Sequence, residues 1–305
     1  MVDISKDKFE IIGANASESQ SIVRPSISYW QDAWRRLKMN KVAMASLVFL
    51  ILLVLMAIFG PYMRPFDYAH QDLLNTNKPF SKVHWFGTDY LGRDLFVRVW
   101  MGARVSLFIG VVIALLDAII GVTYGGIAGY FGGQVDNIMM RIVDILYGIP
   151  YLILVILLMV VMGQGLWTII TAMVMTGWVG MARIVRGQVL QLKEQEFVLA
   201  AKTLGASPGR IILRHLIPNA LGPIIVSMTF DVPNAIFSEA FLSYIGLGIR
   251  APLASWGTLA NDATQVLLMY PMQLFIPGFF ISITMLAFNM LGDGLRDALD
   301  PRLRR

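Results

Sequence analysis

The chain has 305 residues, no cysteine and a formal net charge of +5 at pH 7. Hydrophobic residues make up 56% of it and charged residues only 15%, whereas a soluble chain averages about 45–50% apolar and about 25% charged residues. This composition excludes an ordinary soluble domain, and the lack of cysteine excludes disulfides, thiolate metal sites and cysteine nucleophiles. The charges lie in clusters between long apolar runs. We therefore expect a membrane protein whose positive charge reflects its topology and not nucleic-acid binding.

The N-terminal part of the chain is expected to lie outside the membrane core. Residues 1–25 show no hydrophobic periodicity, so we expect a flexible cytoplasmic tail there. Residues 26–41 place Trp30, Trp34 and Leu37 at helical spacing beside basic side chains. This pattern is typical of an amphipathic helix that lies in a membrane interface. The alternative for this segment is a disordered basic tail.

Six apolar runs are long enough to cross about 30 Å of hydrocarbon as helices of about 20 residues. In chain order they are Val42–Phe59, Ser106–Ala128, Ile142–Met162, Leu166–Ile184, Ala220–Tyr244 and Met272–Leu291. The fold is therefore expected to be all-α, with six transmembrane helices. The first run begins too far from the start for a cleavable signal peptide, so we expect it to remain in the protein. The expected organisation is a first transmembrane helix at 42–60, an extracytoplasmic loop at 61–101, a core with five transmembrane helices at 102–292 and a cytoplasmic tail at 293–305.

The distribution of Lys and Arg predicts the orientation, because cytoplasmic segments of membrane proteins carry an excess of basic residues. With the N-terminus inside, the basic residues that fall outside are Arg64, Lys78, Lys82, Arg93, Arg98, Arg104 and Arg250. The other 18 of the 25 fall in the inner segments. Both termini are therefore expected in the cytoplasm, together with the polar break between the fourth and fifth apolar runs.

That break, EFVLAAKTLGASPGRIILRHLIPNA, has the pattern of two short helices joined by a tight turn. Gly205 stands where a helix end needs a residue with a left-handed backbone. Ser207 followed by Pro208 is typical of the start of the next helix. Pro218 is expected to end this second helix before the fifth apolar run begins.

Apolar side chains are expected to form a continuous face on this helix pair. The residues that fall on it are Phe197, Ala200, Ala201 and Leu204 in the first helix and Ile211, Ile212 and Leu216 in the second. Nothing else in the break is available to cover them, and exposed apolar surface of this kind indicates a partner site. The alternative is an ordinary cytoplasmic loop.

The same residues carry a resemblance to a known family. LAAKTLG, followed after nine residues by HLIP, resembles the cytoplasmic coupling signature of ABC importer permeases. The positions that match the signature are Ala200, Ala201, Gly205 and Pro218. Its acidic position is occupied by Leu199, and Glu196, one helical turn earlier, is the candidate for that charge.

Three further stretches resemble the peptide-importing branch of this family. They are HWFGTDYLGRDLFVRVWMGARVSL, EAFLSYIGLG with APLASWG, and DGLRDALDPRLR. They extend the resemblance over nearly the whole chain, which is most similar to the C-type permease subunits of oligopeptide importers. The resemblance implies the type I ABC importer permease fold, with a cytoplasmic coupling-helix pair at 196–218.

The resemblance also implies a function and a set of partners. The chain would form half of the translocation pore of an ATP-driven oligopeptide importer in the bacterial cell membrane. Its implied partners are a homologous second permease subunit, two cytoplasmic ATPase subunits, an extracytoplasmic peptide-binding protein, the peptide and the lipid bilayer. This chain has no phosphate-binding G-x-x-x-x-G-K-[ST] loop, so it would carry no cofactor, and ATP and Mg would bind to the ATPase subunits. The residues implied in ATPase coupling are Glu196, Leu199, Ala200, Ala201, Gly205, Ser207, Arg210 and Pro218.

Polar residues interrupt several of the apolar runs. They are Asp117, Asp231, Asn234, Glu239 and Asn289. Ionisable groups inside a membrane are costly and normally face the interior of a helix bundle or a wet cavity. These five residues are therefore candidates for a polar translocation path, and hydrogen bonding between helices is the alternative for each.

Catalysis by this chain is not expected, because the three histidines are scattered and no H-E-x-x-H motif or paired carboxylates stand at ligand spacing. Permeases for dipeptides, nickel or glutathione are the alternatives within the same family. The rival from a different class is a proton-coupled secondary carrier that uses Asp117 or Asp231. That rival leaves the helix pair in the polar break unexplained.

Overall fold

The computed structural model describes residues 28–300, so the predicted tail at 1–25 lies outside the described residues. Its helices are α2 (Tyr29–Met39), α3 (Lys41–Phe59), α4 (Leu95–Phe131), α5 (Gly133–Tyr147), α6 (Tyr151–Met162), α7 (Leu166–Leu192), α8 (Glu196–Thr203), α9 (Pro208–Ile211), α10 (Ile217–Tyr244), α11 (Trp256–Thr264) and α12 (Met272–Leu299). The shorter elements are η2 (Gly60–Tyr62), η3 (Leu73–Asn75) and the π-helical η4 (Ile212–Leu216). Residues 28–300 contain no β-strand, only an isolated bridge between Thr88 and Asp94. The prediction of an all-α fold is confirmed.

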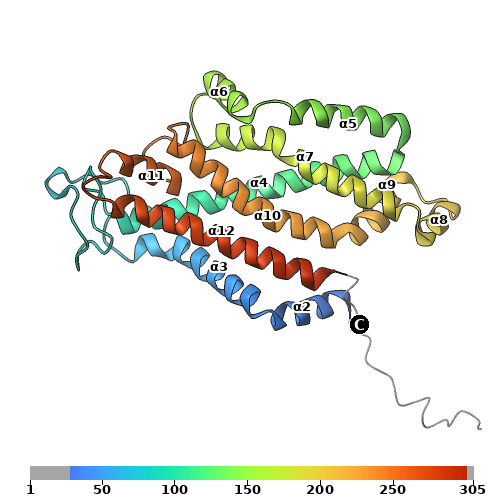
Figure 1. The fold of residues 1–305 in the computed structure, drawn as a ribbon, viewed down its shortest axis with the longest axis horizontal. Coiled ribbons are helices and arrows are strands. Elements are labelled where there is room, and N and C mark those ends of the chain that lie inside the picture. The colour runs from blue at the N-terminus through green and yellow to red at the C-terminus, as the bar shows by residue number, and fades with distance from the viewer. Residues whose placement is uncertain (1–27, 301–305) are drawn as a thin grey trace, which may run out of the picture.

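Five helical stretches within the described range are long and apolar enough to cross a membrane. They are Lys41–Tyr62, Leu95–Phe131, Leu166–Leu192, Pro208–Tyr244 and Met272–Leu299. The bent pair α5 and α6 can make a sixth crossing, which gives the six spans expected from the sequence. Figure 1 shows the long helices side by side along the long axis, with α11 and α8 at opposite ends of the molecule.

The third expected span, Ile142–Met162, is not one straight helix. α5 ends at Tyr147, α6 begins at Tyr151, and the two helices are bent by 81°. Pro150 lies in this break, where it lacks an N–H group for a helical hydrogen bond and disfavours helical backbone at the residue before it. The apolar run Ile142–Met162 is therefore divided into two helices at this proline.

The fifth span also differs from the expectation, because Pro218 does not end the helix that begins at Pro208. α9 continues through η4 into α10, which gives one helical stretch from Pro208 to Tyr244. In η4 the N–H of Ile217 donates to the carbonyl of Ile212, five residues earlier. A π-helical turn is wider than an α-helical one, and it accommodates Pro218, which has no N–H to donate.

α4 and α7 approach closely along a row of glycines on α4. A Cβ atom added to Gly121 would overlap Met181, and one added to Gly129 would overlap Val189. At Gly125 it would meet the backbone of Ala182 itself. Small residues at such positions allow the backbones of two membrane helices to approach. These glycines therefore bring α4 and α7 together around the cavity described below.

The first and last described helices meet at the end of the molecule that carries α8, which we call the α8 end (Figure 1). The Tyr29 hydroxyl donates to the carbonyl of Leu299 at 3.0 Å. α2 buries Ala33 and Leu37 and exposes Trp30 and Trp34, which is the amphipathic pattern expected of the segment 26–41.

Two boundaries differ from those expected. α12 continues to Leu299, so residues 293–299 belong to a helix and not to a separate tail, and 301–305 lie outside the described residues. α4 begins at Leu95 behind the N-cap residue Asp94, so the loop before it is shorter than the expected 61–101. This loop lies with α11 at the opposite end of the molecule, which we call the α11 end (Figure 1).

Candidate functional site

The polar break forms the helix pair that the sequence predicts. α8 ends in a Schellman arrangement, in which the N–H of Gly205 donates to the carbonyl of Lys202 and the N–H of Ala206 donates to that of Ala201. Gly205 has a φ of +80°, a backbone conformation that glycine adopts without the steric cost of a Cβ atom. The prediction of a left-handed turn at Gly205 is confirmed, and this turn sets the direction in which the chain enters α9.

Ser207 and Pro208 begin the second helix at the predicted position. Ser207 is the N-cap residue of α9, with an extended backbone, and Pro208 follows at the first helical position. The Ser207 side chain makes no capping hydrogen bond. The start of this helix therefore depends on the backbone of Ser207 and on the fixed φ of proline.

The apolar face of the helix pair is divided between a buried part and an exposed part. The buried residues are Val198, Ala201, Ile211, Ile212 and Leu216, which pack with residues of α4 and α7 such as Ala118, Met181, Val185 and Val189. These positions are therefore not an exposed partner site, although nothing else in the break covers them. Neighbouring helices cover them, which an inspection of the break by itself does not reveal.

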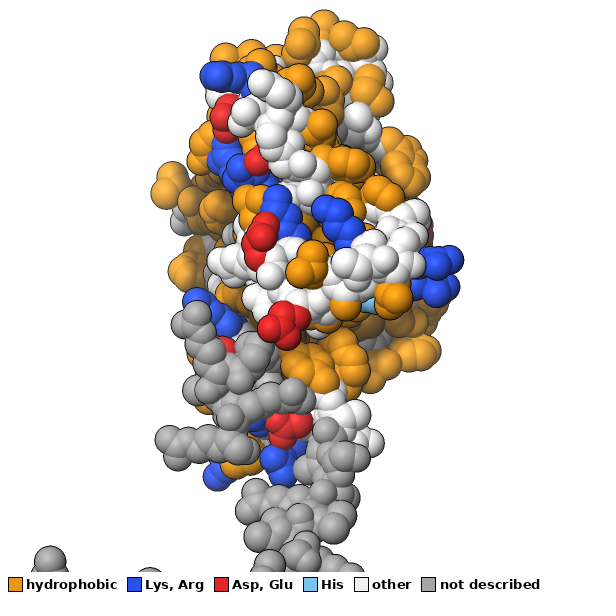
Figure 2. Space-filling model, turned by 90° about the vertical axis from the view of Figure 1, so that its right-hand side faces the viewer, with side chains coloured by type: hydrophobic (Ala, Val, Ile, Leu, Met, Phe, Trp, Pro, Cys, Tyr) orange, Lys and Arg blue, Asp and Glu red, His pale blue; other side chains and the backbone are white. Residues whose placement is uncertain are grey.

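A second set of apolar side chains on the helix pair points outward. Its members are Phe197, Leu199, Leu204 and Leu213. Leu204 is 88% exposed and Leu199 is 62% exposed. Figure 2 views the molecule from the α8 end and shows hydrophobic side chains beside Lys and Arg side chains on this face. We call these four residues the α8 apolar patch.

Charged and polar residues of the same helix pair are also exposed. Glu196, Lys202 and Arg210 are exposed on α8 and α9. The exposed Leu199 occupies the acidic position of the signature, and the exposed Pro218 is the second residue of α10. The α8 end thus presents an apolar patch with a basic and acidic border, which is the composition of a surface that binds another protein.

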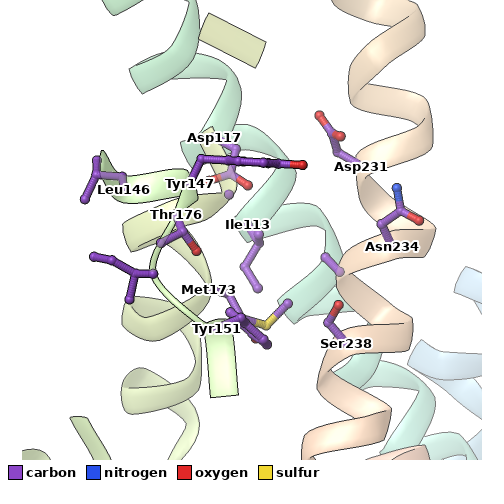
Figure 3. Close-up of a pocket in the computed structure, with 13 residues that line it drawn as sticks. Ile113, Asp117, Leu146, Tyr147, Tyr151, Met173, Thr176, Asp231, Asn234 and Ser238 are labelled. Atoms are coloured by element: carbon purple, nitrogen blue, oxygen red, sulfur yellow. The ribbon is translucent and has the colours of Figure 1, made fainter. Parts of the chain in front are cut away.

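A cavity of about 400 Å³ lies among α4, α7, α10 and the bend between α5 and α6. Its lining residues are Ile113, Asp117, Leu146, Tyr147, Ile149, Tyr151, Met173, Thr176, Gly177, Asp231, Asn234, Ala235 and Ser238. Three of the five candidates for a polar path, Asp117, Asp231 and Asn234, are therefore brought together. Figure 3 shows Asp117 on α4 across the cavity from Asp231 and Asn234 on α10.

Asp117 is the more buried of the two carboxylates in this cavity, with a relative exposure of 5%. A Cβ atom on Gly177 of α7 would overlap its carboxylate, so the missing side chain at Gly177 makes room for Asp117. Its Oδ1 atom has no hydrogen-bond partner in the described part of the chain, and neither has the hydroxyl of Tyr151. The cavity thus contains polar groups whose hydrogen-bonding capacity is free.

Several cavity residues were not identified from the sequence. Tyr147 and Tyr151 flank the break between α5 and α6, and Thr176 and Ser238 come from α7 and α10. The sequence contained one signal for the tyrosines, since GIPY combines a glycine and a proline within an apolar run. The threonine and serine give no such signal, because small hydroxyl residues are common at contacts between membrane helices.

The other two candidates, Glu239 and Asn289, do not line this cavity. Glu239 is fully buried and accepts hydrogen bonds from the hydroxyls of Ser243 at 2.6 Å and Ser106 at 3.0 Å. The Ser106 hydroxyl also accepts from the backbone N–H of Trp256, so this network joins α4, α10 and α11. Asn289 is exposed on α12. For Glu239 the arrangement favours the packing alternative over the path.

A network of ion pairs joins the 61–94 loop to α11. Arg93 pairs with Asp89 at 2.6 Å and with Asp262 at 3.0 Å, and Arg98 pairs with Asp262 at 3.1 Å. Burial raises the pKa of Asp262 above its usual range, against the opposing effect of Arg98 and Arg93. The pattern of the sequence did not reveal this network, because its members are far apart in the chain.

The arrangement defines a class of protein. The chain forms a bundle of membrane-crossing helices that encloses a polar cavity, and a capped helix pair at one end carries an apolar patch. This combination is typical of a transporter subunit that is driven by a partner protein. Residues 28–300 contain no group of three or more histidine, aspartate or glutamate residues placed to hold a metal.

The sequence of this chain is similar to those of known transport proteins of this class. Residues 121–305 match the family described as binding-protein-dependent transport system inner membrane component, and residues 28–79 match the N-terminal TM domain of oligopeptide transport permease C. The chain is 58% identical, over all 305 residues and the full length of both proteins, to the oligopeptide transport system permease protein OppC of Bacillus subtilis (strain 168). It is 62% identical over 289 residues to the dipeptide transport system permease protein DppC of the same strain, covering 94% of this chain and 90% of that protein.

A solved structure shares the fold. A chain of the MetNI methionine ABC transporter in an inward-facing conformation is 20% identical and superposes with a TM-score of 0.55, over 67% of this chain and 96% of that chain. The present chain belongs to the binding-protein-dependent transport system inner membrane components. It is a multi-pass membrane protein with the fold of type I ABC importer permeases.

Proposed function

We propose that this chain is the permease subunit of an ATP-driven importer of oligopeptides and forms half of its translocation pore. The observation that carries the proposal is the match over the full length of both chains to an oligopeptide permease. The cavity lined by Asp117, Asp231 and Asn234 supports it, since a hydrated peptide needs polar groups along its route through the membrane. Dipeptide transport is the second candidate, because a dipeptide permease is 62% identical to the chain.

The proposed complex contains further subunits. The cavity opens to the surface beside the exposed Asn234 of α10, so a homologous second permease subunit would complete the pore there. Two cytoplasmic ATPase subunits would bind ATP and Mg and supply the energy, and this chain would itself catalyse no reaction. An extracytoplasmic peptide-binding protein would deliver the peptide at the α11 end.

The proposed orientation places the α8 end in the cytoplasm of a bacterial cell, together with both termini. The excess of basic residues in the segments at this end supports it. α2 would then lie in the inner membrane interface. Its exposed Trp30 and Trp34 would be at the level of the lipid headgroups, where tryptophan is enriched.

The α8 apolar patch is the proposed docking surface for an ATPase subunit. Leu199 and Leu204 would enter an apolar pocket on the partner, and the exposed Glu196 and Arg210 would lie at the border of the contact. Because α9 continues through η4 into α10, a displacement of the helix pair would be passed directly to the helix that carries Asp231 and Asn234. The fold thus offers a short mechanical route from the ATPase to the cavity.

The experiment that tests this function is uptake by the whole complex in proteoliposomes. With ATP and the binding protein present, we expect accumulation of a labelled tripeptide, and omission of this chain, of ATP or of the binding protein should each reduce uptake to background. Dissipation of the proton gradient by an ionophore should leave uptake unchanged. Uptake that persists without ATP and collapses with the ionophore would favour the proton-coupled carrier instead. Competition by unlabelled dipeptides and pentapeptides decides between the two candidate substrates.

A further inference from the structure

The cavity between α4 and α10 has an unbalanced set of charges. Asp117 and Asp231 line it, and no Lys, Arg or His is among the thirteen lining residues. The other polar groups in the lining, such as Asn234 and Ser238, are uncharged. A cavity with two carboxylates and no cation of its own is electrostatically suited to a positively charged occupant.

The deeper carboxylate has no partner that would explain its burial. Asp117 has a relative exposure of 5%. Its Oδ1 atom accepts no hydrogen bond from the described part of the chain. A buried polar group without a partner is costly, and a buried charge is costlier still. A buried polar group without a partner needs an explanation, and a ligand that supplies the missing contact is one.

The surroundings of Asp117 hold its carboxylate in this position. Gly177 leaves the space that the carboxylate occupies, since any side chain there would overlap it. The Tyr151 hydroxyl lines the same cavity and is also without a hydrogen-bond partner among the described residues. Asp231 faces Asp117 from α10, as Figure 3 shows. Acceptors thus converge on the cavity from three different helices.

We propose that Asp117 and Asp231 together bind the ammonium group of the transported peptide in this cavity, an inference that rests on the proposed transport of peptides. An ammonium group has only donors, so it suits carboxylate and hydroxyl acceptors that have free lone pairs. Its source is the amino terminus of the peptide or the side chain of a lysine residue within it. Because α10 carries Asp231 and is continuous with the helix pair, movement of α10 relative to α4 would bring the two carboxylates together or separate them.

The test uses the complete complex in proteoliposomes with ATP and saturating binding protein. Uptake of Ala-Ala-Ala, Ala-Lys-Ala and Ala-Glu-Ala is compared between wild type and the variants Asp117→Asn and Asp231→Asn. Each variant removes a charge but keeps the shape of the side chain. We expect the maximal uptake rate to fall roughly tenfold or more, as for the loss of a hydrogen bond between charged groups. Asp117→Glu should recover part of the uptake.

The pattern across the peptides identifies the source of the ammonium group. An equal loss for all three peptides assigns the cavity to the amino terminus, and a larger loss for Ala-Lys-Ala assigns it to the lysine side chain. Asn289→Ala is the matched control, because Asn289 is polar and lies in a span but does not line the cavity. It should transport all three peptides at the wild-type rate.

Wild-type uptake of all three peptides by assembled complexes of both variants would overturn the proposal, and so would an equal loss in Asn289→Ala. Should Asp117→Asn not assemble, Asp231→Asn decides the question, because Asp231 is less buried and its replacement disturbs less packing. Failure of the wild-type complex to take up any peptide would instead contradict the proposed function. The two failures are therefore distinguishable.

Discussion

Asp136 on α5 accepts two hydrogen bonds from the guanidinium group of Arg186 on α7, from Nε at 2.5 Å and from Nη2 at 2.6 Å. The Asp136 side chain is 10% exposed and that of Arg186 is 34% exposed. A bidentate pair of this kind fixes the relative orientation of the two groups as well as their distance. It therefore holds the first half of the bent helix pair against α7.

The first prediction follows from this pair. Asp136→Ala should lower the free energy of unfolding of the purified complex by about 1–2 kcal/mol, which is the contribution of hydrogen bonds between charged groups reduced for the partial exposure of Arg186. The measurement is the thermal unfolding midpoint, which should fall by several degrees. Asp144→Ala is the control, because Asp144 pairs with Arg183 at an exposed position and its loss should cost less than about 1 kcal/mol. Equal shifts for the two variants would contradict the assigned role of the Asp136 pair.

A second prediction concerns the contact between α4 and α7. Gly125→Ala should destabilise the protein by about 1–3 kcal/mol, the usual cost of overpacking, because the new methyl group would meet the backbone of Ala182, which cannot move aside as a side chain can. Gly180→Ala is the matched control, since the space at Gly180 on α7 is open. It should be neutral or slightly stabilising, because alanine is the better helix former. The thermal unfolding midpoints of the two variants, measured side by side, check this difference.

Much of the fold could be predicted from the sequence, because the length of an apolar run determines whether it can span a membrane. Hydropathy alone could not predict the bend at Pro150, because the mean hydropathy of an apolar run is the same whether or not a proline bends the helix. It could not predict that Pro218 continues a helix either, because the outcome depends on the π-helical turn before it. The end of α12 at Leu299 has a local signal, because Pro301 disfavours helical backbone at Asp300.

The candidate site was predicted in part. Asp117, Asp231 and Glu239 gave the same signal, an acidic residue within an apolar run, and only the rotation of each helix about its axis decides which of them meet. Asp117 and Asp231 turn toward one cavity, whereas Glu239 faces a serine network between α4, α10 and α11. Similarly, spacing placed Ala201 and Leu204 on one face of α8, but only the positions of α4 and α7 determine that Ala201 is buried and Leu204 is not.

The orientation gives a third prediction. Leu268 lies between α11 and α12 and is 99% exposed, so Leu268→Cys should react with a membrane-impermeant thiol reagent on intact cells. Ser207→Cys at the α8 end should react only after the membrane is permeabilised. The native chain has no cysteine, so the background is free of other thiols. Ser255, which precedes α11, is unsuitable for this experiment because it is fully buried at the start of that helix. The reverse pattern of labelling would overturn the proposed orientation.

The last prediction concerns the α8 apolar patch. Leu204→Asp should leave membrane insertion and the fold of the chain unchanged, because Leu204 is 88% exposed and packs against little of its own chain. Placing a charge in an apolar contact costs several kcal/mol when no counter-charge is near, so the ATPase subunits should no longer co-purify and peptide uptake should fall to background. Ala201→Asp would not separate the two effects, since Ala201 is buried by the chain itself.

Substitutions of Gly205 test the role of the left-handed turn between α8 and α9. Gly205→Ala should cost roughly 1 kcal/mol, because a Cβ atom disfavours the left-handed turn, while the space around it is open. Gly205→Arg adds a long side chain beside the patch and should also abolish co-purification of the ATPase subunits. The equivalent charge at the other end of the molecule, Leu268→Asp, should leave co-purification of the ATPase subunits unchanged. If Leu204→Asp and Gly205→Arg bind the ATPase subunits and transport peptide as the wild type does, the helix pair is only a loop, and the motion of the ATPases must reach α10 by another surface.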